Sequence, residues 1–353
     1  MTTRAFNPAQ NIPDEPAPRR AGWRSIRLLV AAILVLALAD VGVRATVRGL
    51  VRRPDFRIRA ARAALVDELI AFKASTGKPL VVLLGDATAA GAEGLPDSAT
   101  PAATFTRLVA ARSGGAVEGL ALTLAGARPA DYLFLLRRLE GLPVRGLFVA
   151  LDYAAFSPAQ LAVPLADRNV PPTRTRVDGV DVLAQILSPG ERAAAALSRG
   201  VGSLWAAYRY RAVLGDLLLS GEAHPTPESL ASSRAMYRFD AIDSDAFNVR
   251  HLRLFCRYVQ EQKIEPVFYV APIHWDLIHT AGLMEDSWFQ QNAAFVQNVP
   301  RSFEFETQDL SALVPGDAFL DARQLLPDGN LILAETLVNV AARRGWLGPP
   351  MAY

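Results

Sequence analysis

Short apolar runs alternate with longer amphipathic stretches through most of the chain. Runs rich in Val, Leu and Phe have the length and composition of buried strands at 80–84, 117–124, 144–151, 266–271 and, more briefly, 303–306. Between them, apolar residues recur at helical spacing, most clearly over 102–112, 130–140, 246–262 and 329–344. Strands that alternate with helices predict a three-layer α/β domain, in which helices cover both faces of a parallel sheet.

The N-terminal part of the chain has a different pattern. Residues 1–24 are rich in Pro, Ala and Arg and lack apolar periodicity, which predicts a disordered tail on the cytoplasmic side. An apolar stretch follows over 25–47, and its core from Leu28 to Ala39 carries no charge, so we expect a transmembrane signal anchor. A signal peptide cleaved after Ala37-Leu38-Ala39 is the alternative. Helical spacing between charges over 48–78 predicts an amphipathic stalk helix.

The predicted α/β domain spans 79–345, and its regular alternation is interrupted over about 152–242. The interruption predicts a mainly helical insertion that covers one edge of the sheet. Within it, the aromatic and basic stretch Trp205–Arg211 has two interpretations. Its amphipathic side chains pack the insertion onto the core, or they contact a polysaccharide, a lipid head group or a partner protein.

Composition excludes several classes of function. The net charge is only +2 and the arginine-rich stretches lie near the N-terminus, so nothing indicates a nucleic-acid partner. The single cysteine, Cys256, excludes an intrachain disulfide and a multi-cysteine zinc site. The histidines at 224, 251 and 279 lack the spacing of zinc ligands. We therefore expect no metal and no other cofactor.

Short blocks of small and polar residues follow the predicted strands. The first strand leads into Gly85-Asp86-Ala87-Thr88, the second into Gly126, and the third into Asp152-Tyr153. Before the last helix the chain reads Asp321-Ala322-Arg323-Gln324. In this order the blocks resemble those of the SGNH (GDSL-type) hydrolase superfamily, over about 79–340. The resemblance implies a flavodoxin-like, SGNH-type sheet with its site at the carboxyl edge.

The resemblance also implies which positions would carry the chemistry, and this chain departs from the pattern at three of them. Ala87 holds the position of the nucleophilic serine, and a methyl group cannot attack a carbonyl. Gln324 holds the position of the general base beside Asp321, and an amide has no useful basicity. Asp152 stands where an asparagine donor is usual, and an ionised carboxylate repels an oxyanion.

Other residues at the same edge could restore activity or line a binding pocket. Thr88 carries a hydroxyl next to the vacant nucleophile position. His274 directly follows a predicted strand, so it is a replacement base, a ligand contact or a loop histidine bonded to the local backbone. Asp321 could cap the last helix or bond a neighbouring loop. By resemblance, Asp86 braces the loop, and we expect the pocket to comprise Asp86, Thr88, Gly126, Asp152, Tyr153 and His274.

Membrane-anchored chains of this layout resemble the accessory proteins of alginate acetylation and teichoic-acid D-alanylation. Those proteins work beside membrane-bound O-acyltransferases on exported polymers. The resemblance therefore favours a single pass through the inner membrane with an extracytoplasmic body, although arginines flank the apolar stretch on both sides. It implies a catalytically degenerate protein of cell-envelope or exopolysaccharide assembly that binds a glycan or a partner acyltransferase.

Two alternatives remain open on the sequence alone. One is an active esterase or O-acyltransferase that uses Thr88 and His274 as a relocated nucleophile and base. The other is a purely structural anchor, in which side chains fill the pocket around Ala87.

Overall fold

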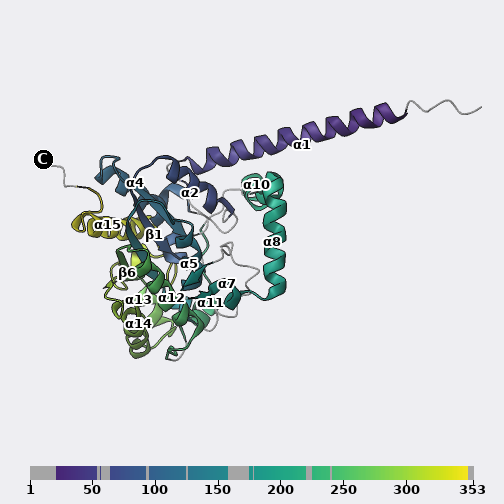
Figure 1. Cartoon of the computed structure of the whole chain (residues 1–353). Coiled ribbons are helices and arrows are strands. Elements are labelled where there is room, and N and C mark those ends of the chain that lie inside the picture. Colours follow the sequence, from purple (N-terminus) through teal and green to yellow (C-terminus); the bar gives the residue numbers. More distant parts are fainter. Residues whose placement is uncertain are drawn as a thin grey trace, which may run out of the picture.

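A computed structural model of the chain describes residues 21–53, 56, 64–92, 95–124, 126–157, 175–177, 179–219, 225–238 and 241–348. The centre of the body is a five-stranded parallel sheet with the strand order β2-β1-β3-β6-β7. Its strands are β1 (Leu80–Gly85), β2 (Glu118–Thr123), β3 (Val144–Leu151), β6 (Pro266–Val270) and β7 (Glu306–Asp309). The predicted α/β fold with a flavodoxin-like parallel sheet is confirmed (Figure 1).

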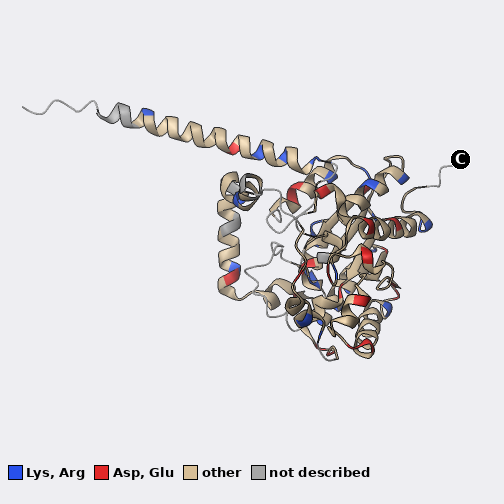
Figure 2. Ribbon diagram, turned by 180° about the vertical axis from the view of Figure 1, so that it is seen from behind, with Lys and Arg blue, Asp and Glu red and all other residues tan. Residues whose placement is uncertain are grey.

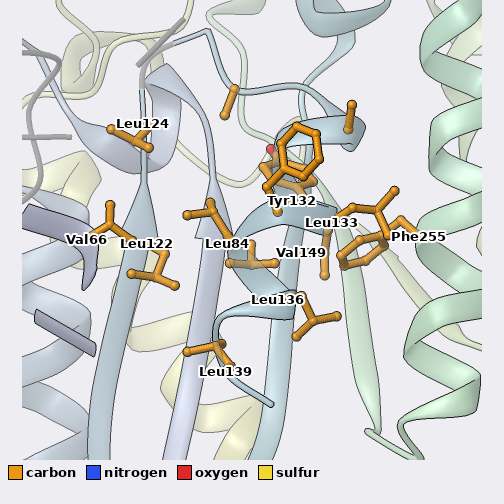
Figure 3. Close-up of a cluster of buried hydrophobic side chains, with 14 of the residues drawn as sticks. Val66, Leu84, Leu122, Leu124, Tyr132, Leu133, Leu136, Leu139, Val149 and Phe255 are labelled. Atoms are coloured by element: carbon orange, nitrogen blue, oxygen red, sulfur yellow. The ribbon is translucent and has the colours of Figure 1, made fainter. Parts of the chain in front are cut away.

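Two helical layers cover the sheet because successive side chains of each strand point to opposite faces. In β1, Val81 and Leu83 face α4 (Pro101–Arg112) and α15 (Pro327–Arg343). Leu84 faces the other layer, which includes α2 (Val66–Ser75), α5 (Pro129–Arg137), α12 (Phe247–Glu261) and α14 (Asp286–Arg301). Figure 3 shows Leu84, Leu122 and Val149 of three strands beside Tyr132, Leu133 and Leu136 of α5 and Phe255 of α12.

The last strand differs from the prediction. The sequence places it at 303–306, whereas β7 begins at Glu306 and pairs with β6 from Val267↔Glu306 onward. Glu304 has a positive φ of 64°, so the chain turns there after α14 before it can join the sheet. Phe303 and Phe305 pack against the core from this turn. Their apolar character therefore reflects packing outside the strand.

A long N-terminal helix, α1 (Ala21–Val51), extends away from the body (Figure 1). Its stretch Ile26–Val51 is long and apolar enough to cross a membrane. Val47, Leu50 and Val51, in its last turns, are buried in the same core cluster as α2. The helix thus continues past the expected anchor boundary at 47. The described part of the expected stalk contains the end of α1, a turn and α2.

The described part of the insertion is mainly helical. It contains a 3₁₀ turn η3 (Tyr153–Phe156), a two-stranded hairpin β4 (Arg176–Val177) and β5 (Val180–Asp181), and five helices. The helices are α7 (Val182–Ile186), α8 (Pro189–Leu204), α9 (Ala206–Arg209), α10 (Arg211–Leu219) and α11 (Leu230–Tyr237). In Figure 1, α8 stands away from the body while α7 and α11 lie against it.

Candidate functional site

The four blocks singled out in the sequence meet near the carboxyl edge of the sheet. Asp86 follows β1 and precedes the short helix α3 (Ala87–Ala90), and Asp152 follows β3. A Cβ at Gly85 would collide with Ala89, so only glycine allows α3 to start directly at the strand end. The Asp321 block lies between β7 and α15. Parallel strands place their ligand crevice at this edge.

A buried arginine occupies the edge. Arg323 is 7% exposed, and its Nη1 lies 3.6 Å from Asp152 Oδ2 and 3.9 Å from Asp86 Oδ2. Its Nε lies 3.3 Å from Glu228 Oε2, a residue of the insertion. We call Asp86, Asp152, Glu228 and Arg323 the Arg323 cluster. It brings together the first, third and last sequence blocks with the insertion.

Burial and mutual proximity determine the charge of the cluster. Removal from water raises the pKa of the Asp86 carboxyl well above its ordinary value, and the neighbouring carboxyl of Asp152 raises it further. Both causes favour the neutral form of the Asp86 carboxyl. Burial disfavours the charged guanidinium of Arg323, yet Asp152 and Asp86 outweigh that effect and raise its pKa. The cluster is one cation surrounded by three carboxyl groups.

Three buried phenols surround these charges. Burial, with the Asp86 and Asp152 carboxyls as further causes, raises the pKa values of Tyr132, Tyr237 and Tyr269. Their hydroxyls therefore remain neutral, and Tyr132 donates its hydrogen bond to the Ala150 carbonyl at 3.2 Å. None of these phenols is a ready nucleophile.

Asp321 holds two loops together. Its Oδ1 accepts hydrogen bonds from the backbone amides of Arg323 and Gln324 at 3.0 and 2.8 Å. Its Oδ2 accepts from the amide of Glu228 at 2.9 Å. Of its two predicted roles, the structure shows the bond to a neighbouring loop, because the N-cap of α15 is Leu326. The side-chain oxygen Oε1 of Gln324 is buried without a hydrogen-bond partner in the described part of the chain.

The nucleophile side of the edge offers no activated hydroxyl. Ala87 opens α3, at the position where the resemblance would place a serine. Thr88 is 1% exposed, and its amide donates to Asp86 Oδ1 at 3.2 Å. Its hydroxyl has no hydrogen-bond partner among the described residues, so no base there can take its proton.

His274 serves as a helix cap. Its Nδ1 accepts a hydrogen bond from the Leu277 amide at 3.3 Å, at the start of α13 (Trp275–Thr280). Its ring stacks on Phe319 with the centroids 5.2 Å apart. The cap occupies the lone pair of Nδ1, so the proton of the neutral ring lies on Nε2. In the described residues no hydroxyl bonds to this imidazole, and no cluster has the ligands of a metal site.

The remaining predicted pocket residues have structural partners. Gly126 has φ 75° in the turn between β2 and α5. Asp152 Oδ1 accepts from the Ala154 amide at 2.8 Å and so caps η3. The Tyr153 hydroxyl accepts from Asn292 Nδ2 at 3.0 Å, and its ring stacks on Tyr237. The asparagine donor of the family pattern therefore has no replacement in these side chains.

Sequence reasoning missed Arg323 and Glu228. Arg323 sits inside the quoted Asp321–Gln324 block, where an arginine beside the vacant base position was a visible signal. Glu228 comes from the insertion, 95 residues earlier, and only the fold brings it to Arg323. A cavity of about 410 Å³ lies elsewhere, between α2, α4 and the edge strand β2, where Phe72, Arg107 and Glu118 line it.

Comparison with known proteins gives only distant structural likenesses. No protein-family model matches the chain, and no curated protein matches its sequence. A lipase/acylhydrolase from Enterococcus faecalis shares 12% identity with a TM-score of 0.41, covering 78% of this chain and 100% of its own. A carbohydrate acetylesterase from Sinorhizobium meliloti shares 12% identity with a TM-score of 0.35, over 76% and 100% of the two chains. At such low identity and TM-score, they say nothing about the substrate of this chain.

Proposed function

We propose that this protein is a membrane-anchored, catalytically inactive SGNH-like protein that acts in cell-envelope or exopolysaccharide assembly. The observation that carries the proposal is the Arg323 cluster beside Ala87 and Gln324. Acyl transfer needs a nucleophile with a base in hydrogen-bond reach and donors aimed at the developing oxyanion. Here the nucleophile and base positions are inert, and carboxylates already oppose the nearby cation.

The insertion supports a role in holding a partner rather than in binding substrate at this edge. Glu228 pairs with Arg323, the Glu228 amide donates to Asp321, and Tyr237 is fully buried against the same carboxylates. These contacts cover part of the carboxyl edge with residues of the insertion. A membrane-bound O-acyltransferase is therefore the favoured partner, with a glycan polymer as the alternative.

The anchor is part of the same proposal. Ile26–Val51 has the length and hydropathy of a single membrane span. Many apolar side chains of α1 are not buried by other described parts of the protein. For example, Leu28, Val35 and Leu38 are 63–72% exposed. Such a surface is stable in lipid and costly in water. We place the body on the extracytoplasmic side of the inner membrane.

The catalytic half of the proposal is tested by hydrolysis of p-nitrophenyl acetate. The full chain in detergent micelles should hydrolyse the ester no faster than micelles alone, and Thr88→Val and His274→Asn should leave that rate unchanged. Wild-type turnover that disappears in either variant would instead establish an active esterase with a relocated nucleophile or base.

The assembly half is tested by chemical cross-linking in native membranes followed by mass spectrometry. A membrane-bound O-acyltransferase should be among the proteins joined to the body. Adducts with polysaccharide alone would replace the partner role with glycan binding.

A further inference from the structure

The helix α8 of the insertion exposes its apolar face, whereas its opposite face is less exposed. In α8, Ala193, Leu197 and Val201 follow one another at intervals of four residues and so share one face. All three are exposed, Leu197 by 71% and Val201 by 38%. A helix on a water-soluble surface turns such a face inward.

The opposite face of α8 is less exposed and contacts α9 (Ala206–Arg209) at its C-terminal end. Arg192, Ala195 and Gly202 share that face, and they are less exposed than the apolar positions. Gly202 is buried, and a Cβ added there would meet the side chain of Arg209 at 3.4 Å. The apolar positions of α8 therefore lie on its more exposed face.

Two contacts set the position of α8 along α1. The Ala206 amide, one residue past the C-cap Trp205, donates to Asp40 Oδ1 at 2.5 Å. Asp40 is the first charged residue after the uncharged core of the span. The Tyr210 hydroxyl donates to Glu68 Oε1 at 2.5 Å, so the segment that follows α8 also contacts α2. The C-terminal end of α8 is thus held where the apolar part of α1 ends.

The direction of α8 fits a membrane surface. In Figure 1, α8 runs across the direction of α1 and lies beside it at one end only. A helix that crosses the direction of a membrane span lies along the membrane plane. Figure 2 shows charged positions on the half of α1 next to the body and again near its far end, with an uncharged stretch between them.

The residues next to α8 suit the boundary between lipid and water. Trp205 is 44% exposed at the end of the helix, and tryptophan is enriched at membrane interfaces. Arg211 is exposed, and its guanidinium lies 4.4 Å from the centre of the Tyr208 ring. Apolar positions together with an aromatic ring and a cation are the pattern of an interfacial helix.

We infer that α8 is an interfacial helix that lays Ala193, Leu197 and Val201 into the lipid surface from which α1 emerges. The inference rests on the proposed membrane anchor and adds a second contact with lipid. This contact limits the tilt of the body relative to the membrane plane, which a single span leaves free. The Arg323 cluster would then face a constant direction relative to the membrane.

Site-specific fluorescence tests the inference on the full chain in vesicles of phosphatidylcholine and phosphatidylglycerol. Cys256 is the only cysteine, it is fully buried, and burial raises the pKa of its thiol, so a cysteine introduced on the surface can be labelled selectively. The probe is a bimane at Leu197→Cys, with Arg192→Cys as the matched control on the opposite face. Lipid brominated near the head group should quench Leu197→Cys several-fold more than Arg192→Cys, since interfacial helices bury their apolar face roughly 5–10 Å deep.

A third label separates this inference from the anchor itself. Val35→Cys lies in the middle of the apolar part of α1 and should be quenched by lipid brominated deep in the acyl chain. If Val35→Cys is quenched and the two α8 labels are equal, the interfacial helix is refuted and the anchor stands. If Val35→Cys is not quenched, both fail. If Leu197→Cys is protected only in native membranes, a protein partner covers α8 and the lipid inference is overturned.

Discussion

Arg323 is the residue on which the candidate site depends. Its guanidinium is the only cation that the structure shows among Asp86, Asp152 and Glu228, and it is almost completely buried. Removing one partner of such a buried group leaves uncompensated charge in a medium that cannot solvate it. The cluster therefore contributes to stability at the carboxyl edge of the sheet, where open α/β folds bind their ligands.

Arg323→Met should destabilise the full chain by about 3–5 kcal/mol, because methionine retains much of the volume but leaves the carboxylates unpaired. Arg344→Met is the matched control. Arg344 pairs with Glu306 on the surface and is 39% exposed, so its loss should cost less than about 1 kcal/mol. Chemical denaturation of both variants in detergent measures the difference, and equal values would show that the buried cluster is not a stabilising unit.

Asp86 predicts a distinct dependence of stability on pH. Its pKa in the folded state is raised above the ordinary value of 3.8, so above that pH the folded chain binds more protons than the unfolded chain. The contribution of Asp86 to stability is therefore most favourable at low pH and declines as pH rises toward its folded pKa. The decline is on the order of 1 kcal/mol per pH unit.

Asp86→Asn should remove this decline, because asparagine mimics the protonated carboxyl and its oxygen can still accept from the Thr88 amide. Unfolding curves between pH 4 and pH 8 compare the variant with wild type. A variant that keeps the wild-type slope would show that Asp86 is ionised in the folded protein.

The sequence pointed to the positions of the candidate site but not to the contacts that its side chains make. Ala87 and Gln324 could be recognised as inert because side-chain reactivity follows from residue type alone. The cluster could not be foreseen, since Glu228 comes from the insertion and Arg323 reaches back to two other strands. Similarly, nothing in the residue type of His274 reveals that its ring caps α13.

At the scale of elements, strands and helices follow the sequence pattern closely where both faces are buried. The central strand β3 spans the predicted residues 144–151, since a continuous apolar run has few other environments. The edge strand β7 is displaced because Phe303 and Phe305 have the apolar character of a strand but pack beside the sheet. The amphipathic spacing of α8 is present in the sequence, whereas its outward orientation is visible only in the structure.

Gly119 predicts how tightly α4 packs on β2. A Cβ at this position would lie 2.7 Å from the backbone Cα of Thr106, which cannot move without shifting the helix. Gly119→Ala should cost about 1–3 kcal/mol. Gly215→Ala in α10 meets nothing within 4 Å and should stabilise by up to about 1 kcal/mol through helix propensity. Thermal unfolding measures both, and a neutral Gly119→Ala would indicate looser packing of this layer.

At the scale of the whole molecule, α1 and the body form a continuous structure. The last turns of α1 enter the core cluster through Val47, Leu50 and Val51, and Asp40 bonds to the insertion. The body is therefore connected to the span by buried contacts rather than by a flexible linker. This arrangement suits a protein whose function depends on the position of its body relative to the membrane.

A single charge in the middle of α1 should weaken the insertion of the protein into the membrane. Leu34→Arg places a cation in the middle of the apolar stretch and should weaken membrane insertion by about 3 kcal/mol. Leu331→Arg is the control, because Leu331 lies on the surface of α15 and is 41% exposed. Extraction of native membranes at alkaline pH should release more of the first variant than of the second, and equal release would argue against α1 as the anchor.

The central claim is that the catalytic edge of this SGNH-type fold is inert and held by Arg323. It is tested most directly by treating the full chain with a fluorophosphonate and weighing the intact protein. The double variant Ala87→Ser, Gln324→His serves as the comparison with the family positions restored. We expect no adduct on the wild-type chain. A stoichiometric adduct on Thr88 or any other residue of that edge would contradict the account and identify the true nucleophile.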